Sequence, residues 1–108
     1  MIELIAEVGS NFDGDLDVAK RHVAAAKQAG AGVVKFQTLT RETLMARFVR
    51  DSDTGQLQAN PRFDGFSNLA LPDNWHYALK RTADDEGIEF MSTPFFLEAV
   101  DLLEDVGV

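Results

Sequence analysis

The sequence contains no cysteine, and this absence excludes two kinds of site. Neither a disulfide scaffold nor a thiolate metal site can form without cysteine. The absence fits a protein of a reducing compartment.

Basic residues are also few. Ten lysines and arginines stand against eighteen aspartates and glutamates, which gives a formal net charge of -8. The sequence has no run of basic residues and no patch in which basic and aromatic residues alternate. We therefore expect neither nucleic acid nor an anionic membrane surface as a partner.

Long apolar runs are missing as well. No stretch approaches the ~18 apolar residues of a membrane span, and residues 1–4 do not begin a secretory signal. The composition, 45% hydrophobic and 26% charged, is that of a globular protein, and 108 residues allow one domain. We expect a cytoplasmic protein without a membrane segment.

What the sequence does contain is an alternation of apolar strands and amphipathic helices. The expected strands are residues 2–8, Val33–Thr38 and 88–92, with Thr93 and Pro94 ending the third. The expected helices are residues 15–29, capped by Asp15, then 72–86, then 97–105, with Val100 and Leu103 buried in the last. Gly107 would stop that helix, and Val108 would open a fourth strand.

The connection after the second strand is long. Residues 40–50 can form a short helix with Leu44 and Phe48 one turn apart, whereas residues 51–72 read mostly as loop. A long connection between a strand and a helix is more often functional than accidental.

Strand, helix and strand joined by short connections form βαβ units with parallel strands. Three such units predict an α/β fold with two candidate architectures. One is the start of a (β/α)8 barrel, roughly three-eighths of it, and the other is a doubly wound open sheet of about five strands. In either case we expect the chain to be a fragment of a longer protein.

Polar residues finish each strand: Glu7 on the first, Lys35 and Gln37 on the second, Ser92 and Thr93 on the third. Both architectures bind ligands at the carboxyl ends of their strands. Because side chains alternate along a strand, Lys35 and Gln37 share one face, and Val34 and Phe36 share the other. In a barrel Glu7 and Thr93 would join the inward set, with the helices covering the apolar faces.

An ammonium, a carboxamide and a hydroxyl at one place suit a phosphate or a carboxylate, and Glu7 would add a base or a charge partner. A simpler alternative is that Glu7 and Lys35 only pair with each other. Residues 9–11 are not a dinucleotide fingerprint, and no glycine-rich phosphate loop occurs.

Other residues are weaker candidates. His22 and His76 lie on predicted helices without the spacing of metal ligands, and we expect both at the surface or in an interface. The aromatic residues Trp75, Phe48 and Phe90 are expected in the core.

Four motifs, in order, resemble the sialic acid synthase family: residues 6–11 (AEVGSN), 13–16 (DGDL), 29–31 (AGA) leading into 34–38 (VKFQT), and 87–95 (GIEFMSTPF). The resemblance covers the whole chain except an insertion at about residues 41–66. The last residues also match the run into that family's fourth strand.

The resemblance implies a (β/α)8 barrel that condenses phosphoenolpyruvate with an N-acylated amino sugar such as N-acetylmannosamine. Phosphate is released, and a nine-carbon 2-keto acid of the sialic acid type is formed. Carried over by motif, Glu7 is a proton-transfer residue, and Lys35, Gln37 and Thr93 bind phosphoenolpyruvate. Asn11 and Ser92 are candidate loop contacts.

The resemblance also implies a divalent metal, Mn²⁺ or Mg²⁺, that polarises the sugar aldehyde. Its histidine ligands would come from strands beyond residue 108, so no metal ligand is expected in this segment. A C-terminal antifreeze-like domain, also beyond residue 108, would cap the partner barrel in a homodimer. We therefore expect these 108 residues alone to be inactive.

One departure concerns the loop after the first strand, where the family usually has Asn-His and this chain has Asn11 followed by Phe12. Two alternatives to the synthase remain. One is another 3-deoxy-keto acid synthase that uses phosphoenolpyruvate with a phosphorylated aldose, but no second basic pocket is evident. The other is a non-catalytic receiver-like or flavodoxin-like domain; a receiver needs an aspartate where the third strand ends in Thr93.

Overall fold

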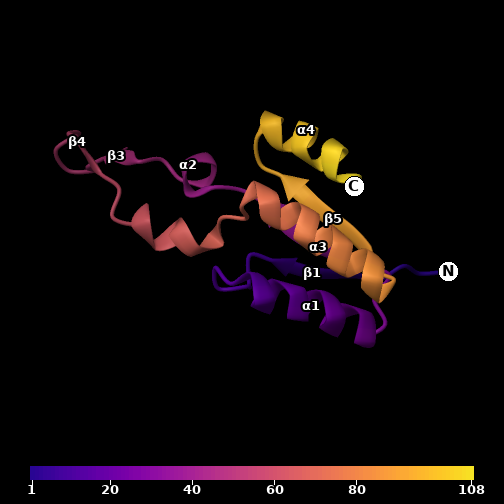
Figure 1. Cartoon of the computed structure of the whole chain (residues 1–108). Coiled ribbons are helices and arrows are strands. Elements are labelled where there is room, and N and C mark those ends of the chain that lie inside the picture. Colours follow the sequence, from indigo (N-terminus) through magenta and orange to yellow (C-terminus); the bar gives the residue numbers. More distant parts are fainter.

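The computed structural model describes all 108 residues. In chain order its elements are β1 (Ile5–Gly9), α1 (Leu16–Gln28), β2 (Val33–Thr38), α2 (Arg41–Leu44), β3 (Phe48–Arg50), β4 (Leu57–Ala59), the 3-10 helix η1 (Asp64–Leu69), α3 (Asp73–Glu86), β5 (Glu89–Pro94) and α4 (Leu97–Val106). Figure 1 shows these elements along the chain.

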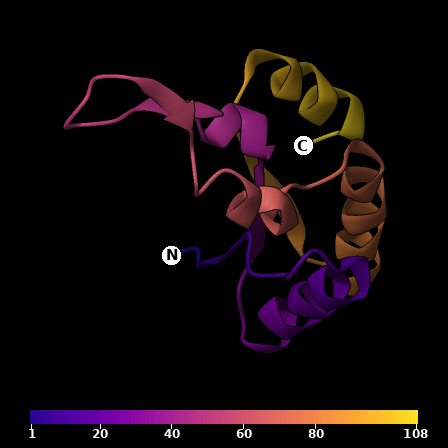
Figure 2. The same ribbon diagram turned by 90° about the vertical axis from the view of Figure 1, so that its left-hand side faces the viewer.

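The three parallel strands form a sheet in the order β1-β2-β5, with β2 in the middle. The spatial order of these strands is the same as their order along the chain. Helix α1 packs against α3, and α3 packs against α4. Figure 2 shows these three helices in an arc along one side of the sheet. The α/β fold with parallel strands, expected from the sequence, is confirmed.

The core lies between the sheet and these helices. It includes Val34, Phe36 and Phe90 from the strands and Val23 and Leu79 from the helices. The faces of β1 and β2 that were expected to meet helices do so, because alternation sends every second side chain to the same layer. Residues 2–4 are an exception, since β1 begins only at Ile5 and Leu4 is exposed.

Local sequence explains where α1 begins. The Asp15 carboxylate accepts hydrogen bonds from the backbone N–H groups of Asp17 and Val18, at 2.8 and 3.2 Å. This satisfies two of the four N–H groups that lack partners in the first turn of a helix. The expected cap is confirmed, and the buried residues Ala19, Val23 and Ala26 form the predicted apolar stripe.

The long connection differs from the expectation. The helix after β2 spans only Arg41–Leu44, because Met45 is already extended, and Phe48 begins a strand that pairs antiparallel with β4. Phe48 is 52% exposed, so its expected place in the core was wrong. The hairpin β3–β4, which we call the arm, projects from the body at the end opposite both termini (Figure 1).

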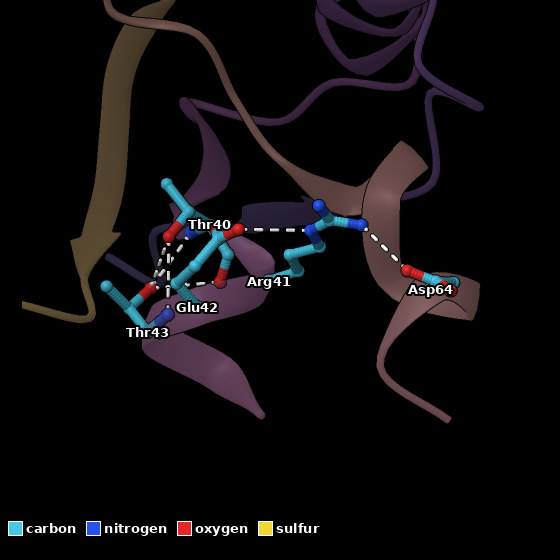
Figure 3. Close-up of polar contacts among 5 residues, drawn as sticks. All are labelled: Thr40, Arg41, Glu42, Thr43 and Asp64. Atoms are coloured by element: carbon cyan, nitrogen blue, oxygen red, sulfur yellow. Dashed lines mark hydrogen bonds and ion pairs between the residues drawn. The ribbon is translucent and has the colours of Figure 1, made fainter. Parts of the chain in front are cut away.

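Helix α2 holds the base of the arm to η1. A capping box between Thr40 and Thr43 begins the helix, and the Arg41 guanidinium donates to the Asp64 carboxylate at 3.0 Å. Figure 3 shows the Arg41 side chain reaching from α2 to Asp64. The same guanidinium lies over the Phe63 ring, 4.6 Å from its centroid.

Three further expectations were wrong. His76 is fully buried, because α3 turns its side chain onto the end of β2. Val100 is 44% exposed, because α4 uses Ala99 and Leu103 to contact the body. Strand β5 continues to Pro94 instead of ending at Ser92, since Thr93 and Pro94 remain in register with β2.

Candidate functional site

The register of the sheet brings four of the predicted site residues together. Glu7 on β1 lies opposite Lys35 on β2, and Gln37 on β2 lies opposite Thr93 on β5. Lys35 and Gln37 are two residues apart and therefore share a face. This is the face that the helices leave uncovered, at the carboxyl ends of the strands.

Glu7 and Lys35 form an ion pair across the two strands, with 3.3 Å between Lys35 Nζ and Glu7 Oε2. The simpler alternative, in which these residues pair with each other, is thus observed. Their side chains are nevertheless 45% and 33% exposed, respectively. An exposed pair contributes about 0–1 kcal/mol, and the ammonium has three donors, so Lys35 remains able to bind an incoming anion.

The end of β1 is shaped by a bulge between Glu7 and Gly9. Gly9 has a positive φ of 61°. A Cβ at this position would lie 3.3 Å from Glu7 Oε1 and 3.7 Å from the Gln37 side-chain amide. Glycine therefore allows the turn and lets the Glu7 and Gln37 side chains approach the backbone from two strands.

Ser10 is a site residue that sequence reasoning missed. Its hydroxyl donates to Gln37 Oε1 at 3.3 Å. With the carbonyl oxygen of Gln37 engaged, the amide NH₂ group is oriented as a donor for a ligand. The signal that could have identified Ser10 was its place directly after Gly9 at the carboxyl end of β1.

Asn11 lies beside these residues in an open pocket of about 320 Å³. The pocket is lined by Ser10, Asn11 and Asp13 from the loop after β1 and by Asn68 and Leu69 from η1. Most of these residues carry hydroxyl, amide or carboxylate groups. The pocket thus adjoins the four-residue site through Ser10, which also contacts Gln37.

Ser92 does not lie with the four residues. It is buried on the helix-facing side of β5, and its hydroxyl lies 2.7 Å from Thr38 Oγ1. Phe12, where the family usually has histidine, also faces away from the site. It is fully buried in the core, with its ring centroid 6.2 Å from those of Phe36 and Trp75.

No group of three or more histidine, aspartate or glutamate side chains comes close enough together to hold a metal ion. Glu7 has Lys35 as its charged neighbour, and this pair alone does not provide a ligand set for a divalent metal. No helix of the chain has both the length and the apolar character needed to span a bilayer.

Comparison with known proteins identifies the class. A model of the NeuB family matches residues 22–108, and the chain belongs to this family. The resemblance to sialic acid synthases is thereby confirmed.

Three relatives illustrate the range of the family. The chain is 39% identical to the N,N'-diacetyllegionaminic acid synthase of Legionella pneumophila subsp. pneumophila, over 97% of this chain and 30% of that protein. It is 32% identical to a pseudaminic acid synthase of Campylobacter jejuni subsp. jejuni, over 94% of this chain and 30% of that protein. It is 31% identical to the N-acetylneuraminate-9-phosphate synthase of Homo sapiens, over 97% of this chain and 30% of that protein.

The fold comparison agrees. The crystal structure of the N-acetylneuraminic acid synthetase from Leptospira borgpetersenii serovar Hardjo-bovis, in complex with citrate, matches with a TM-score of 0.80 and 27% sequence identity. The match covers 96% of this chain and 33% of that chain. The chain thus spans about a third of the length of the proteins that it resembles.

Proposed function

We propose that the protein condenses phosphoenolpyruvate with an N-acylated amino sugar, releasing phosphate and forming a nonulosonate of the sialic acid type. The observation that carries this proposal is the meeting of Glu7, Lys35, Gln37 and Thr93 on one uncovered sheet face, in a chain of the NeuB family. We also propose that residues 1–108 are the N-terminal portion of a (β/α)8 barrel.

The arrangement of the helices supports the barrel. In a doubly wound sheet helices cover both faces, whereas in a barrel they form an outer layer on one side. Here α1, α3 and α4 lie along one side of the sheet, and the strands follow one another in sequence order (Figure 2). The polar strand ends would then face the barrel axis.

Each side chain has a role in this proposal. The Lys35 ammonium, the Gln37 amide and the Thr93 hydroxyl donate hydrogen bonds to the phosphate and carboxylate of phosphoenolpyruvate. Its C=C π electrons form a bond from the methylene carbon to the sugar aldehyde carbon, while the aldehyde C=O π bond opens to an alkoxide. Water adds at C2, after which the C2–O bond to phosphate breaks. Glu7 lies beside Lys35; it takes the proton that the attacking water gives up and passes it to the alkoxide oxygen of the former aldehyde.

The pocket beside the anion site supplies a place for the sugar. Its hydroxyl and amide groups, from Ser10, Asn11 and Asn68, suit the hydroxyl and N-acyl groups of such a substrate. The relatives are named for different sugar acids, so we expect the identity of the sugar to depend on residues in loops such as this one.

Family resemblance further leads us to propose a divalent metal requirement, a homodimer and a cytoplasmic location. The residues of this chain do not form a metal site, so we propose that the metal ligands come from strands beyond residue 108. Phosphoenolpyruvate and the sugar are the proposed partners.

The test is phosphate release by the protein at its full natural length. Phosphoenolpyruvate would be offered with a panel of N-acylated amino sugars, including 6-phosphorylated forms. We expect release with at least one sugar and its loss in Glu7→Gln, which keeps the shape of the side chain but removes the proton acceptor. Absence of release with every sugar would contradict the proposal.

A further inference from the structure

Three buried polar side chains form one connected group on the helix-facing side of the sheet. Thr38, His76 and Ser92 are the only buried polar or charged residues, at 1%, 0% and 7% exposure. Thr38 Oγ1 lies 2.8 Å from His76 Nε2 and 2.7 Å from Ser92 Oγ, and His76 Nδ1 lies 2.9 Å from the Pro72 carbonyl oxygen. Buried polar groups are costly unless satisfied, and no buried side-chain nitrogen or oxygen lacks a partner.

The direction of each hydrogen bond follows from chemistry. The Pro72 carbonyl can only accept, so His76 carries its proton on Nδ1. A neutral imidazole then accepts at Nε2, and Thr38 must donate to it. The Thr38 oxygen is left to accept from the Ser92 hydroxyl. Burial lowers the pKa of His76, which keeps the ring neutral and this direction unique.

The group sits directly behind the site. Thr38 follows Gln37 on β2, and Ser92 precedes Thr93 on β5, while Gln37 and Thr93 are paired across the two strands. The hydrogen bond between the Thr38 and Ser92 hydroxyls therefore joins the ends of β2 and β5. The opposite face of these two strand ends carries Gln37 and Thr93, two of the proposed anion-binding residues. His76 anchors this bond to the first turn of α3.

We infer that His76 is a positioning residue, which through Thr38 and Ser92 holds the ends of β2 and β5 so that Gln37 and Thr93 can bind phosphoenolpyruvate together. This inference rests on the proposed function. It gives His76 a role in the binding of one substrate in addition to its contribution to the stability of the fold, and the two roles separate experimentally.

Two substitutions at His76 distinguish its two hydrogen bonds. An asparagine amide reaches the position of Nδ1 and can keep the bond to Pro72, whereas a glutamine amide reaches the position of Nε2 and can accept from Thr38. His76→Asn should raise the KM for phosphoenolpyruvate roughly tenfold, and His76→Gln should stay within about twofold of the wild type. The KM for the sugar should change in neither variant.

His22 provides a matched control. Its Nδ1 lies 3.0 Å from the Val18 carbonyl oxygen four residues earlier, the same contact that His76 makes with Pro72, but it touches no strand hydroxyl. His22→Asn should leave both KM values unchanged. Thr38→Val is a second probe, since it removes the linking hydroxyl at nearly constant volume, and it should raise the KM for phosphoenolpyruvate as His76→Asn does.

The measurement is steady-state phosphate release by the protein at natural length, with thermal unfolding recorded for each variant. Equal KM values for phosphoenolpyruvate in His76→Asn and His76→Gln, or no change in Thr38→Val, would overturn the inference while wild-type activity upheld the function. No release by the wild type would overturn the proposed function and, with it, the inference.

Discussion

Lys35 carries the positive charge at the centre of the candidate site, and Glu7 is its one ion-pair partner. Lys35→Met should raise the KM for phosphoenolpyruvate roughly tenfold to a hundredfold, because a hydrogen bond from a charged donor is lost. Stability should change by about 1 kcal/mol or less, because the pair is partly exposed. Phosphate-release kinetics and urea unfolding measure the two effects.

Lys80→Met is the control for Lys35→Met. Lys80 also forms an ion pair, 2.6 Å from the Asp84 carboxylate, but it does so on α3, away from the strand ends. It should lose no activity. A similar KM for phosphoenolpyruvate in wild type and Lys35→Met would exclude Lys35 from anion binding.

The burial of His76 should make the stability of the protein depend on pH. Burial lowers its pKa below the ordinary value of 6.5, an effect that the Pro72 carbonyl and the neighbouring Asp73 only partly offset. The unfolded chain therefore takes up the proton first as the pH falls. The contribution of neutral, buried His76 to the free energy of unfolding is therefore fully present above pH 6.5. This contribution is lost as the pH falls from 6.5 through the lowered pKa of His76 in the folded state.

Urea unfolding of the chain, followed by the fluorescence of Trp75, its single tryptophan, measures this effect. Between about pH 7.5 and pH 5.5 the wild type should lose more stability than His76→Gln, by at most about 1.4 kcal/mol per pH unit. The two proteins differ only at residue 76, so the difference between their slopes reports His76. Identical slopes would contradict a lowered pKa.

At the scale of elements, the end of β1 is a position where both the backbone conformation and the space beside it restrict the residue type to glycine. Gly9 combines a positive φ with a Cβ position 3.3 Å from Glu7 Oε1. Gly9→Ala should therefore cost about 1 kcal/mol in backbone strain and also displace the Glu7 carboxylate, lowering kcat. Phosphate release and urea unfolding would record both effects.

Gly55 separates the two consequences of Gly9→Ala. It too has a positive φ, 70°, but no atom lies within 4 Å of the position that its Cβ would occupy. Gly55→Ala should share the cost in stability and keep full activity. Loss of activity in both variants, or in neither, would show that the contact with Glu7 does not matter.

Elements whose ends are set by neighbouring residues were predictable. Asp15 before α1 and Gly87 after α3 act on the nearest turn of helix, and both ends lie where the sequence indicated. The arm was not predictable, because β3 and β4 are short strands that exist only through pairing with each other. Leu44 and Phe48 matched a helical spacing equally well, and pairing overrode it.

The whole molecule is elongated, 54 × 29 × 27 Å, because the arm projects from the body (Figure 1). The arm and its base expose the arginines at positions 47, 50 and 62, whereas the other basic residues lie mainly on helices. Limited trypsin digestion should therefore cut first after one of these three arginines. Mass spectrometry of the earliest fragments identifies the bond.

Cleavage first within α1 or α3 would contradict this description of the arm. The basic residues there, such as Lys20 and Arg81, lie in hydrogen-bonded helices that pack against each other. A protease needs an extended backbone, so cutting there would require those helices to open first.

Sequence alone determined the α/β class, the start of α1, the end of α3 and the side of each strand on which its residues lie. Alternation along a strand is a property of the backbone, so Lys35 and Gln37 had to share a face whatever surrounded them. The four sequence motifs also indicated the family, because they place the residue types of an anion-binding site at the carboxyl ends of the strands.

Only the tertiary structure decided which strands lie side by side and what their faces meet. In the folded chain Glu7 pairs with Lys35, and Ser10 donates a hydrogen bond to Gln37. Phe12 is buried in the core, and His76 lies on the helix-facing side of the sheet, behind the site. These outcomes depend on contacts between residues far apart in the chain. Local patterns carry no information about the partner that a side chain will meet, and packing supplies that partner.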